Sequence, residues 1–243
     1  MFRIRIQNKK KCIWYCSAVV SFLLFLLLLG WTNHLANTQD AQQMAGRWSE
    51  KKDVAQISCF FSSKAEVTED TIQSFEYSLK NVLQEASITE TSENPSARLW
   101  VDAYSADGKI TLVNGKNTLD ANAIGIGGDF FMFHPLKLIT GAYFSGNDLM
   151  QDYCIIDQDA AWQLFGSNDV VGMTVYIGNV PHIVTGVVQR PDSRMDKAAG
   201  LNSTVVYVSY ETLSAYGTNN GINHYEIVMP NPVDEFAYGK VKE

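Results

Sequence analysis

The sequence is poor in the residues that mark several common protein classes. Its 243 residues include four cysteines, six prolines and 17 glycines. So few cysteines exclude a small scaffold held together by disulfides, and so little proline and glycine exclude collagen-like or proline-rich architecture. Charged residues make up 19% of the chain and hydrophobic residues 46%. This composition is typical of a folded chain rather than a disordered one.

Acidic residues are missing from the start of the chain, where basic residues are concentrated. Residues 1–11 carry five basic side chains, and the first acidic residue is Asp40. The rest of the chain holds 14 basic side chains against 26 acidic ones, a net charge of −12, whereas the whole chain has −7. A general nucleic-acid binder needs a basic surface, so this balance argues against a nucleic-acid partner.

Charge of either sign is absent from residues 12–31, and Phe22–Leu29 within them is an unbroken run of Phe and Leu. A helix of this length, at about 1.5 Å per residue, crosses about 30 Å of hydrocarbon. Trp14, Tyr15 and Trp31 lie near its ends, where amphipathic rings prefer the membrane interface. The sequence therefore predicts a transmembrane helix over 12–31 that contacts membrane lipid.

The basic residues before this segment predict its direction. By the positive-inside rule, residues 1–11 form a cytoplasmic tail and residues 32–243 lie outside the cytoplasm. A cleaved signal peptide has the same charge pattern, but its apolar core is shorter and ends at a small-residue cleavage site. Because the segment around Gly30-Trp31-Thr32-Asn33 is a poor cleavage site, we favour an uncleaved, single-pass anchor in the cell membrane.

Short strands and helices follow the apolar segment without strict alternation. Residues 32–53 are expected to form a helical stalk or a linker. Apolar patterning predicts helices at 66–86, 130–133, 157–165 and 210–216, and again after Pro232. It predicts strands at 54–61, 97–104, 109–113, 119–126, 153–156, 173–177, 182–189, 204–208 and 225–229, with a hairpin turn at 106–108. This mixture favours an α+β fold of two subdomains.

Motifs for catalysis and metal binding are not found. There is no phosphate-binding loop or G-x-S-x-G motif, and Gly125-Ile126-Gly127-Gly128 lacks the third glycine of a dinucleotide loop. Asp148, Asp152, Asp157 and Asp159 lack the spacing of a calcium loop. The histidines have no zinc-site spacing; they are His34, His134, His182 and His224. We therefore expect no enzyme activity, no catalytic, cofactor-binding or metal residues, and no cofactor.

Two cysteines, Cys59 and Cys154, lie beyond the apolar segment. An oxidising compartment permits a disulfide between them, but the sequence does not show that their Cβ atoms meet. Two unpaired structural cysteines are the other reading.

A series of short motifs in the second half of the chain resembles one known family. Their order and spacing are similar to those of the MacB-like periplasmic core domain of MacB/FtsX-type ABC transporter permeases. The motifs are Gly141-Ala142-Tyr143-Phe144 followed by Asp148, Ala160–Gly166 with its Leu-Phe-Gly end, Val171–Val175, Val184–Val188 and Val206–Ser209. Ala142 stands where the family usually has Arg.

The resemblance implies a function. Residues 54–231 would be the core domain, and residues 232–243 would begin the connection to a further membrane helix. A separate ABC ATPase and the remaining permease helices would be partners, with a dimer in the full transporter. The domain would bind a peptide, drug or lipoprotein substrate, or a partner protein, and relay ATPase-driven motion without bond chemistry.

An alternative is a single-pass sensor, adaptor or surface binding protein with the same fold. It is motivated by the sequence after Trp31, where no second membrane-length apolar run occurs. Candidate contact surfaces are the segments 130–138 and 189–201, which can equally be plain connectors.

Overall fold

The computed structural model describes residues 9–37, 39–49, 53–89, 98–190, 194, 198 and 203–242. The chain divides into two compact units, Met1–Gln43 and Met44–Glu243. We call the second unit the sheet domain and describe each unit by itself.

The N-terminal unit contains one long helix, α1 (Lys9–Asn37), and a short 3-10 helix, η1 (Asp40–Gln42). Residues Ile13–Leu35 of α1 are long and apolar enough to cross a membrane, and none of the most apolar window is buried inside the structure. Burial in a protein core therefore does not explain the apolar composition of α1 within the described residues. A helix covers the predicted residues 12–31 and continues as far as Asn37. Of the segment 32–53 that we expected as a helical stalk or a linker, Met44–Trp48 forms a short helix in the second unit.

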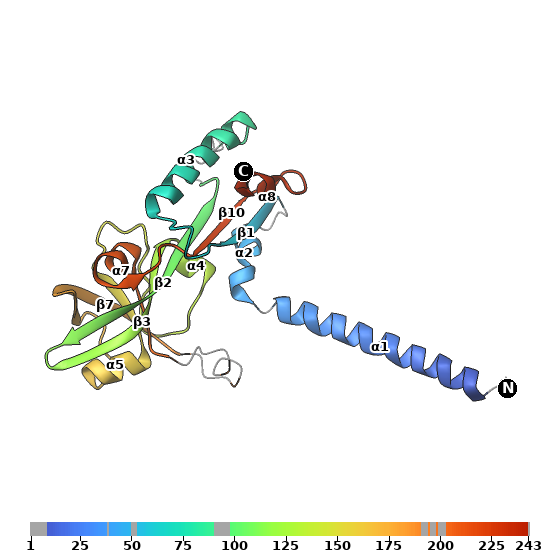
Figure 1. The fold of residues 1–243 in the computed structure, drawn as a ribbon, viewed down its shortest axis with the longest axis horizontal. Helices are drawn as coiled ribbons and strands as arrows, with labels where there is room; N and C mark the ends of the chain where they lie inside the picture. Colours follow the sequence, from blue (N-terminus) through green and yellow to red (C-terminus); the bar gives the residue numbers. More distant parts are fainter. Residues whose placement is uncertain are drawn as a thin grey trace. The chain divides into compact units, whose positions relative to one another are not determined.

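Within its described residues, the sheet domain is built on one mixed sheet of ten strands, and Figure 1 shows how the helices lie around it. The strand order is β1-β10-β2-β3-β8-β5-β7-β4, while β6 pairs with β2 and β7, and β9 pairs with β2. The pairs β3–β8 and β5–β7 are parallel and the others antiparallel. The strands are β1 (Val54–Phe60), β2 (Val101–Asn114), β3 (Asn117–Gly128), β4 (Leu138–Gly141), β5 (Tyr153–Asp157), β6 (Thr174–Ile177), β7 (Val180–Val188), β8 (Val205–Ser209), β9 (Thr218–Asn219) and β10 (His224–Pro230).

Helices cover both faces of this sheet, which confirms the α+β class. They are α2 (Met44–Trp48), α3 (Glu69–Glu85), α4 (Phe130–Phe133), α5 (Gln158–Phe165), α7 (Tyr210–Tyr216) and α8 (Phe236–Lys242). Local signals set several of their ends. The Asp157 side chain caps α5 by accepting a hydrogen bond from the Ala160 N–H, and Gly166 ends the helix in the left-handed conformation.

The predicted hairpin turn at 106–108 is wrong, because β2 runs straight through these residues. The turn lies at Gly115-Lys116 instead, where Gly115 has a positive φ and Asn114 pairs with Asn117. Gly108 serves another purpose. A Cβ atom there would lie 2.4 Å from the Thr218 carbonyl oxygen, so glycine allows β9 to approach β2.

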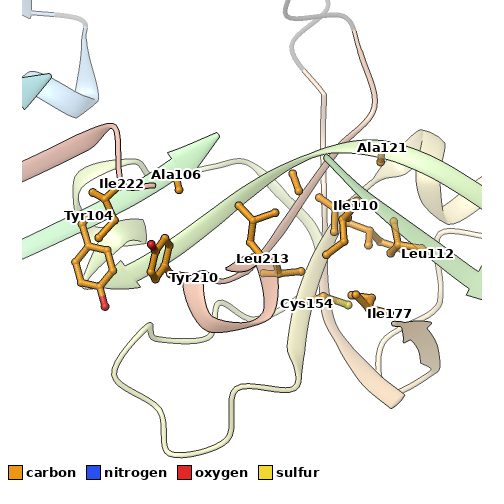
Figure 2. Close-up of a cluster of buried hydrophobic side chains, with 14 of the residues drawn as sticks. Tyr104, Ala106, Ile110, Leu112, Ala121, Cys154, Ile177, Tyr210, Leu213 and Ile222 are labelled. Atoms are coloured by element: carbon orange, nitrogen blue, oxygen red, sulfur yellow. The ribbon is translucent and has the colours of Figure 1, made fainter. Parts of the chain in front are cut away.

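Among the described residues, the hydrophobic core consists of two clusters on opposite faces of the sheet. Neighbouring residues of a strand alternate between them: Ile227 of β10 belongs to the first cluster and Val228 to the second. The first cluster lies under α3, α5, α7 and α8, and Figure 2 shows Leu213 of α7 among its members. The second lies under α2 and α4. One unit with two clusters thus replaces the two subdomains that we expected.

Both cysteines of the sheet domain are free. Cys154 is fully buried in the first cluster, where burial raises the pKa of its thiol to about 12. Cys59 packs against the same cluster and is partly buried. Of the two alternatives for Cys59 and Cys154, the structure therefore has two unpaired structural cysteines and no disulfide between them.

Candidate functional site

The chain enters and leaves the sheet domain against the same strand. It enters through α2 and leaves through α8, and both helices contact β1 (Figure 1). Met44 of α2 is buried in the second cluster, whereas Ala237 of α8 is buried in the first. The strand pair β1–β10 therefore lies between α2 and α8, the first and the last described helix of the domain, with one helix packed on each face.

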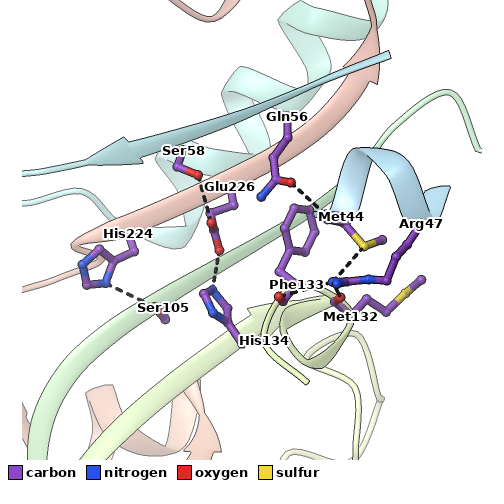
Figure 3. Close-up of polar contacts among 10 residues, drawn as sticks. All are labelled: Met44, Arg47, Gln56, Ser58, Ser105, Met132, Phe133, His134, His224 and Glu226. Atoms are coloured by element: carbon purple, nitrogen blue, oxygen red, sulfur yellow. Dashed lines mark hydrogen bonds and ion pairs between the residues drawn. The ribbon is translucent and has the colours of Figure 1, made fainter. Parts of the chain in front are cut away.

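Side-chain hydrogen bonds fix α2 to the sheet and to α4 (Figure 3). The amide oxygen of Gln56 in β1 accepts a bond from the Met44 N–H at 2.9 Å. The Arg47 guanidinium donates to the carbonyl oxygens of Met132 and Phe133, at 2.6 and 3.5 Å. A guanidinium bound to backbone carbonyls makes a charge-assisted contact, which is stronger than a neutral one.

The same α4 is tied to β10 through its C-cap residue. The His134 ring pairs with the Glu226 carboxylate, which also accepts a hydrogen bond from the Ser58 hydroxyl at 2.9 Å. Burial alone would raise the pKa of Glu226, but the bonds from His134 and Ser58 and the charge of His134 lower it below its ordinary value. We call the set Arg47, Gln56, Ser58, Met132, His134 and Glu226 the junction network.

A second polar cluster lies on the opposite face, where α3 packs on the sheet. The Tyr104 hydroxyl donates to Glu69 at 2.8 Å, and the Tyr225 hydroxyl donates to Asp102 at 3.0 Å. Glu76 of α3 hydrogen-bonds to Asp102, and burial together with the charge of Asp102 raises the pKa of Glu76 to about 8. Two carboxyl groups in contact share one proton, because ionising both would place two negative charges side by side at a high cost in free energy.

One pocket has a volume of about 760 Å³ and opens on the face of the second cluster. It brings together parts of the two segments that we expected to form contact surfaces, Pro135–Lys137 and Gln189-Arg190. Residues Phe130, Phe131 and Phe133 of the first segment are instead buried in the core. Most of residues 191–201 lie outside the described part of the chain.

The acidic side chains of this pocket are already bonded to the protein. Asp157 accepts hydrogen bonds from the Ala160 and Val205 N–H groups, and Asp107 accepts one from the side chain of Asn223. The two cationic side chains that line the pocket differ in their surroundings. Arg190 pairs with Asp159, whereas Lys137 is exposed.

His182 and His134 lie at different sites in the sheet domain. His182 is buried between the Val180 carbonyl and the Thr212 hydroxyl, at 3.0 and 3.1 Å, which makes it a structural residue. His134 belongs to the junction network. Within the described ranges, no three His, Cys, Asp or Glu side chains gather as metal ligands. Sequence reasoning missed the junction network because its members lie on four separate segments with no shared spacing.

Comparison with known proteins identifies the family. The model of the MacB-like periplasmic core domain matches residues 20–238, so the chain belongs to this family. It is a domain of transporter permeases and not an enzyme family. The chain thus carries the periplasmic core domain of a MacB-type ABC transporter permease after one candidate membrane helix.

Two curated relatives are macrolide export ATP-binding/permease proteins named MacB. The protein of Chromobacterium violaceum is 32% identical over 99 residues, which cover 40% of this chain and 15% of the relative. That of Pasteurella multocida is 30% identical over 98 residues, covering 40% and 14%. The chain therefore spans less than a fifth of the length of these relatives.

Two solved structures are also similar. The extracellular domain of the noncanonical ABC-type transporter YknZ from Gram-positive bacteria has a TM-score of 0.46 and 18% identity, covering 76% of this chain and 88% of that one. The periplasmic region of MacB from Actinobacillus actinomycetemcomitans has a TM-score of 0.44 and 23% identity, covering 62% and 68%.

Proposed function

We propose that this chain is the membrane-anchored extracytoplasmic part of a MacB-type permease, and that the sheet domain relays ATPase-driven motion and binds substrate or partners. A separate ABC ATPase and further permease helices are its partners, and two copies act together in the transporter. The domain performs no bond chemistry. Peptides, drugs and lipoproteins remain the candidate substrates.

The observation that carries the proposal is the packing of the strand pair β1–β10 between α2 and α8. Motion delivered to either end of the domain reaches this strand pair first. The junction network then extends the contact to α4, which lies in the second cluster. Rigid elements joined by buried packing and charged hydrogen bonds carry displacement over distance.

Copurification tests the proposal. The full-length chain is extracted from its native membrane in mild detergent, and the captured proteins are identified by mass spectrometry. We expect an ABC ATPase and a protein with several membrane helices. An intact chain that captures neither supports the alternative, a single-pass sensor, adaptor or surface binding protein.

The proposed orientation has its own test, which uses a membrane-impermeant thiol reagent on whole cells. Ser78 is exposed on α3, so the Ser78→Cys variant is expected to react. The Gln7→Cys variant is expected to react only after lysis, because residues 1–11 are assigned to the cytoplasm. The buried Cys154 serves as an internal control that reacts only after denaturation. Reaction at position 7 alone would invert the orientation.

A further inference from the structure

We propose that the 760 Å³ pocket binds a small amphiphilic anion, a molecule with an apolar body and one carboxylate head. This deepens the proposed binding role of the domain, but it needs no ATPase to operate. The volume lies within the range of about 300–1,000 Å³ that is usual for small-molecule sites.

The floor of the pocket fits an apolar body. It is formed by side chains of the central strands and of the 135–137 segment: Ile124, Leu136, Val188, Val205 and the ring of Tyr207. Ile124, Leu136 and Tyr207 are partly buried and pack against the second cluster, and Val188 belongs to it. The surface is therefore built on the rigid core, and a bound apolar group would remove it from water.

The charges at the rim select the head group. Asp157 is only 2% exposed, and each oxygen of its carboxylate accepts a backbone hydrogen bond, so a cationic ligand has little access to it. Asp107 is engaged by Asn223, and Arg190 by Asp159.

Three polar side chains of the pocket remain for a ligand. Within the described residues, the ammonium of Lys137 has no ion pair, and the hydroxyl of Tyr207 and the side-chain amide of Gln189 have no hydrogen-bond partner. The ammonium is a cationic donor, and the hydroxyl and amide can also donate. Together they match a carboxylate, which accepts several hydrogen bonds and carries the opposite charge.

Photolabelling tests this site with two probes that share one apolar body. 4-Benzoylbenzoate carries a carboxylate, and 4-benzoylbenzylamine carries an ammonium group. Each is irradiated with the full-length chain in nanodiscs of zwitterionic lipid, and the labelled peptides are mapped by mass spectrometry. We expect the carboxylate probe to label peptides that contain residues 122–124, 135–137 and 205–207, in preference to the amine.

Variants locate the labelling. Val205→Trp fills the pocket and is expected to lower labelling by about tenfold, as about tenfold weaker binding of the probe would. Val233→Trp adds the same ring at an exposed position outside the pocket and should leave labelling unchanged. Lys137→Gln is expected to lower carboxylate labelling about two- to fivefold and to spare the amine, as an exposed charge contact allows. Lys80→Gln on the exposed side of α3 is its matched control.

Labelling that is equal for the two probes, or that is insensitive to Lys137→Gln, would overturn the proposal. So would labelling confined to α1. Lys137 is exposed, so its variant keeps the test valid even where Val205→Trp fails to fold. Because labelling is measured without an ATPase, a failed copurification and an unlabelled pocket are separate outcomes.

Discussion

Arg47 in the first helix of the sheet domain donates a 2.6 Å hydrogen bond to the carbonyl oxygen of Met132 in α4. Two residues further along, His134 pairs with Glu226 of β10. Arg47 therefore links the point where the chain enters the domain to the strand that leads to its last helix.

Replacing Arg47 tests this link. Arg47→Ala removes a charge-assisted hydrogen bond to α4, so we expect a loss of about 1–2 kcal/mol in the free energy of unfolding. Chemical denaturation of the full-length chain, followed by tryptophan fluorescence, measures it. Lys80→Ala on the exposed side of α3 is the control and should change stability by less than about 0.5 kcal/mol. Equal effects of the two variants would argue against the link.

Glu226 predicts how acid affects the domain. Its pKa in the folded state is lower than its ordinary value of 4.5. The folded state therefore holds this proton less tightly than the unfolded state, and the stabilisation is present above pH 4.5 and lost as the pH falls through the lowered pKa. Glu226→Gln should flatten the acid limb of stability against pH. An unchanged acid limb would show that another group controls it.

Glu76 predicts the opposite trend at higher pH. Its pKa is raised from 4.5 to about 8, so the folded state binds this proton more tightly than the unfolded state. The stabilisation is fully present below pH 4.5 and is lost as the pH rises through 8. Thermal unfolding between pH 5 and 9 measures this, and Glu76→Gln should weaken the fall. Glu85→Gln, at an exposed position of the same helix, should retain it. Loss of the trend in both variants would refute the assignment to Glu76.

Gly108 is expected to tolerate no side chain. A Cβ atom there would lie 2.4 Å from the Thr218 carbonyl oxygen and 3.0 Å from the Leu213 side chain. Gly108→Ala should therefore cost about 1–3 kcal/mol of stability. Gly46 in α2 has nothing within 4 Å of the same position, so Gly46→Ala should be neutral or stabilise by up to about 1 kcal/mol. A neutral Gly108→Ala in thermal melts would contradict the close approach of β9.

Features with local causes could be predicted from the sequence. The apolar helix follows from a run without charge, and α5 follows from its cap Asp157 and its stop Gly166. The family resemblance was also correct, because its motifs are turns and strand starts that lie close together in the chain.

Features with tertiary causes could not be predicted. Gly108 resembled a turn because its role depends on β9, a strand of two residues that lies far away in the sequence. The junction network joins residues as far apart as Ser58 and Glu226. The pocket is lined by the 135–137 segment together with residues of β3, β7 and β8. Periodicity in the sequence does not predict that such distant segments lie side by side.

The proposed relay is tested most directly by hydrogen–deuterium exchange on the full-length chain in complex with its copurified ATPase. Exchange is compared with and without a non-hydrolysable ATP analogue, in the wild type and in Arg47→Ala. We predict that the nucleotide changes the protection of amides in α2, α4 and β10, that α5 is unaffected, and that the change in α4 disappears in the variant. A complex in which the nucleotide binds but leaves α2, α4 and β10 unchanged would contradict the account.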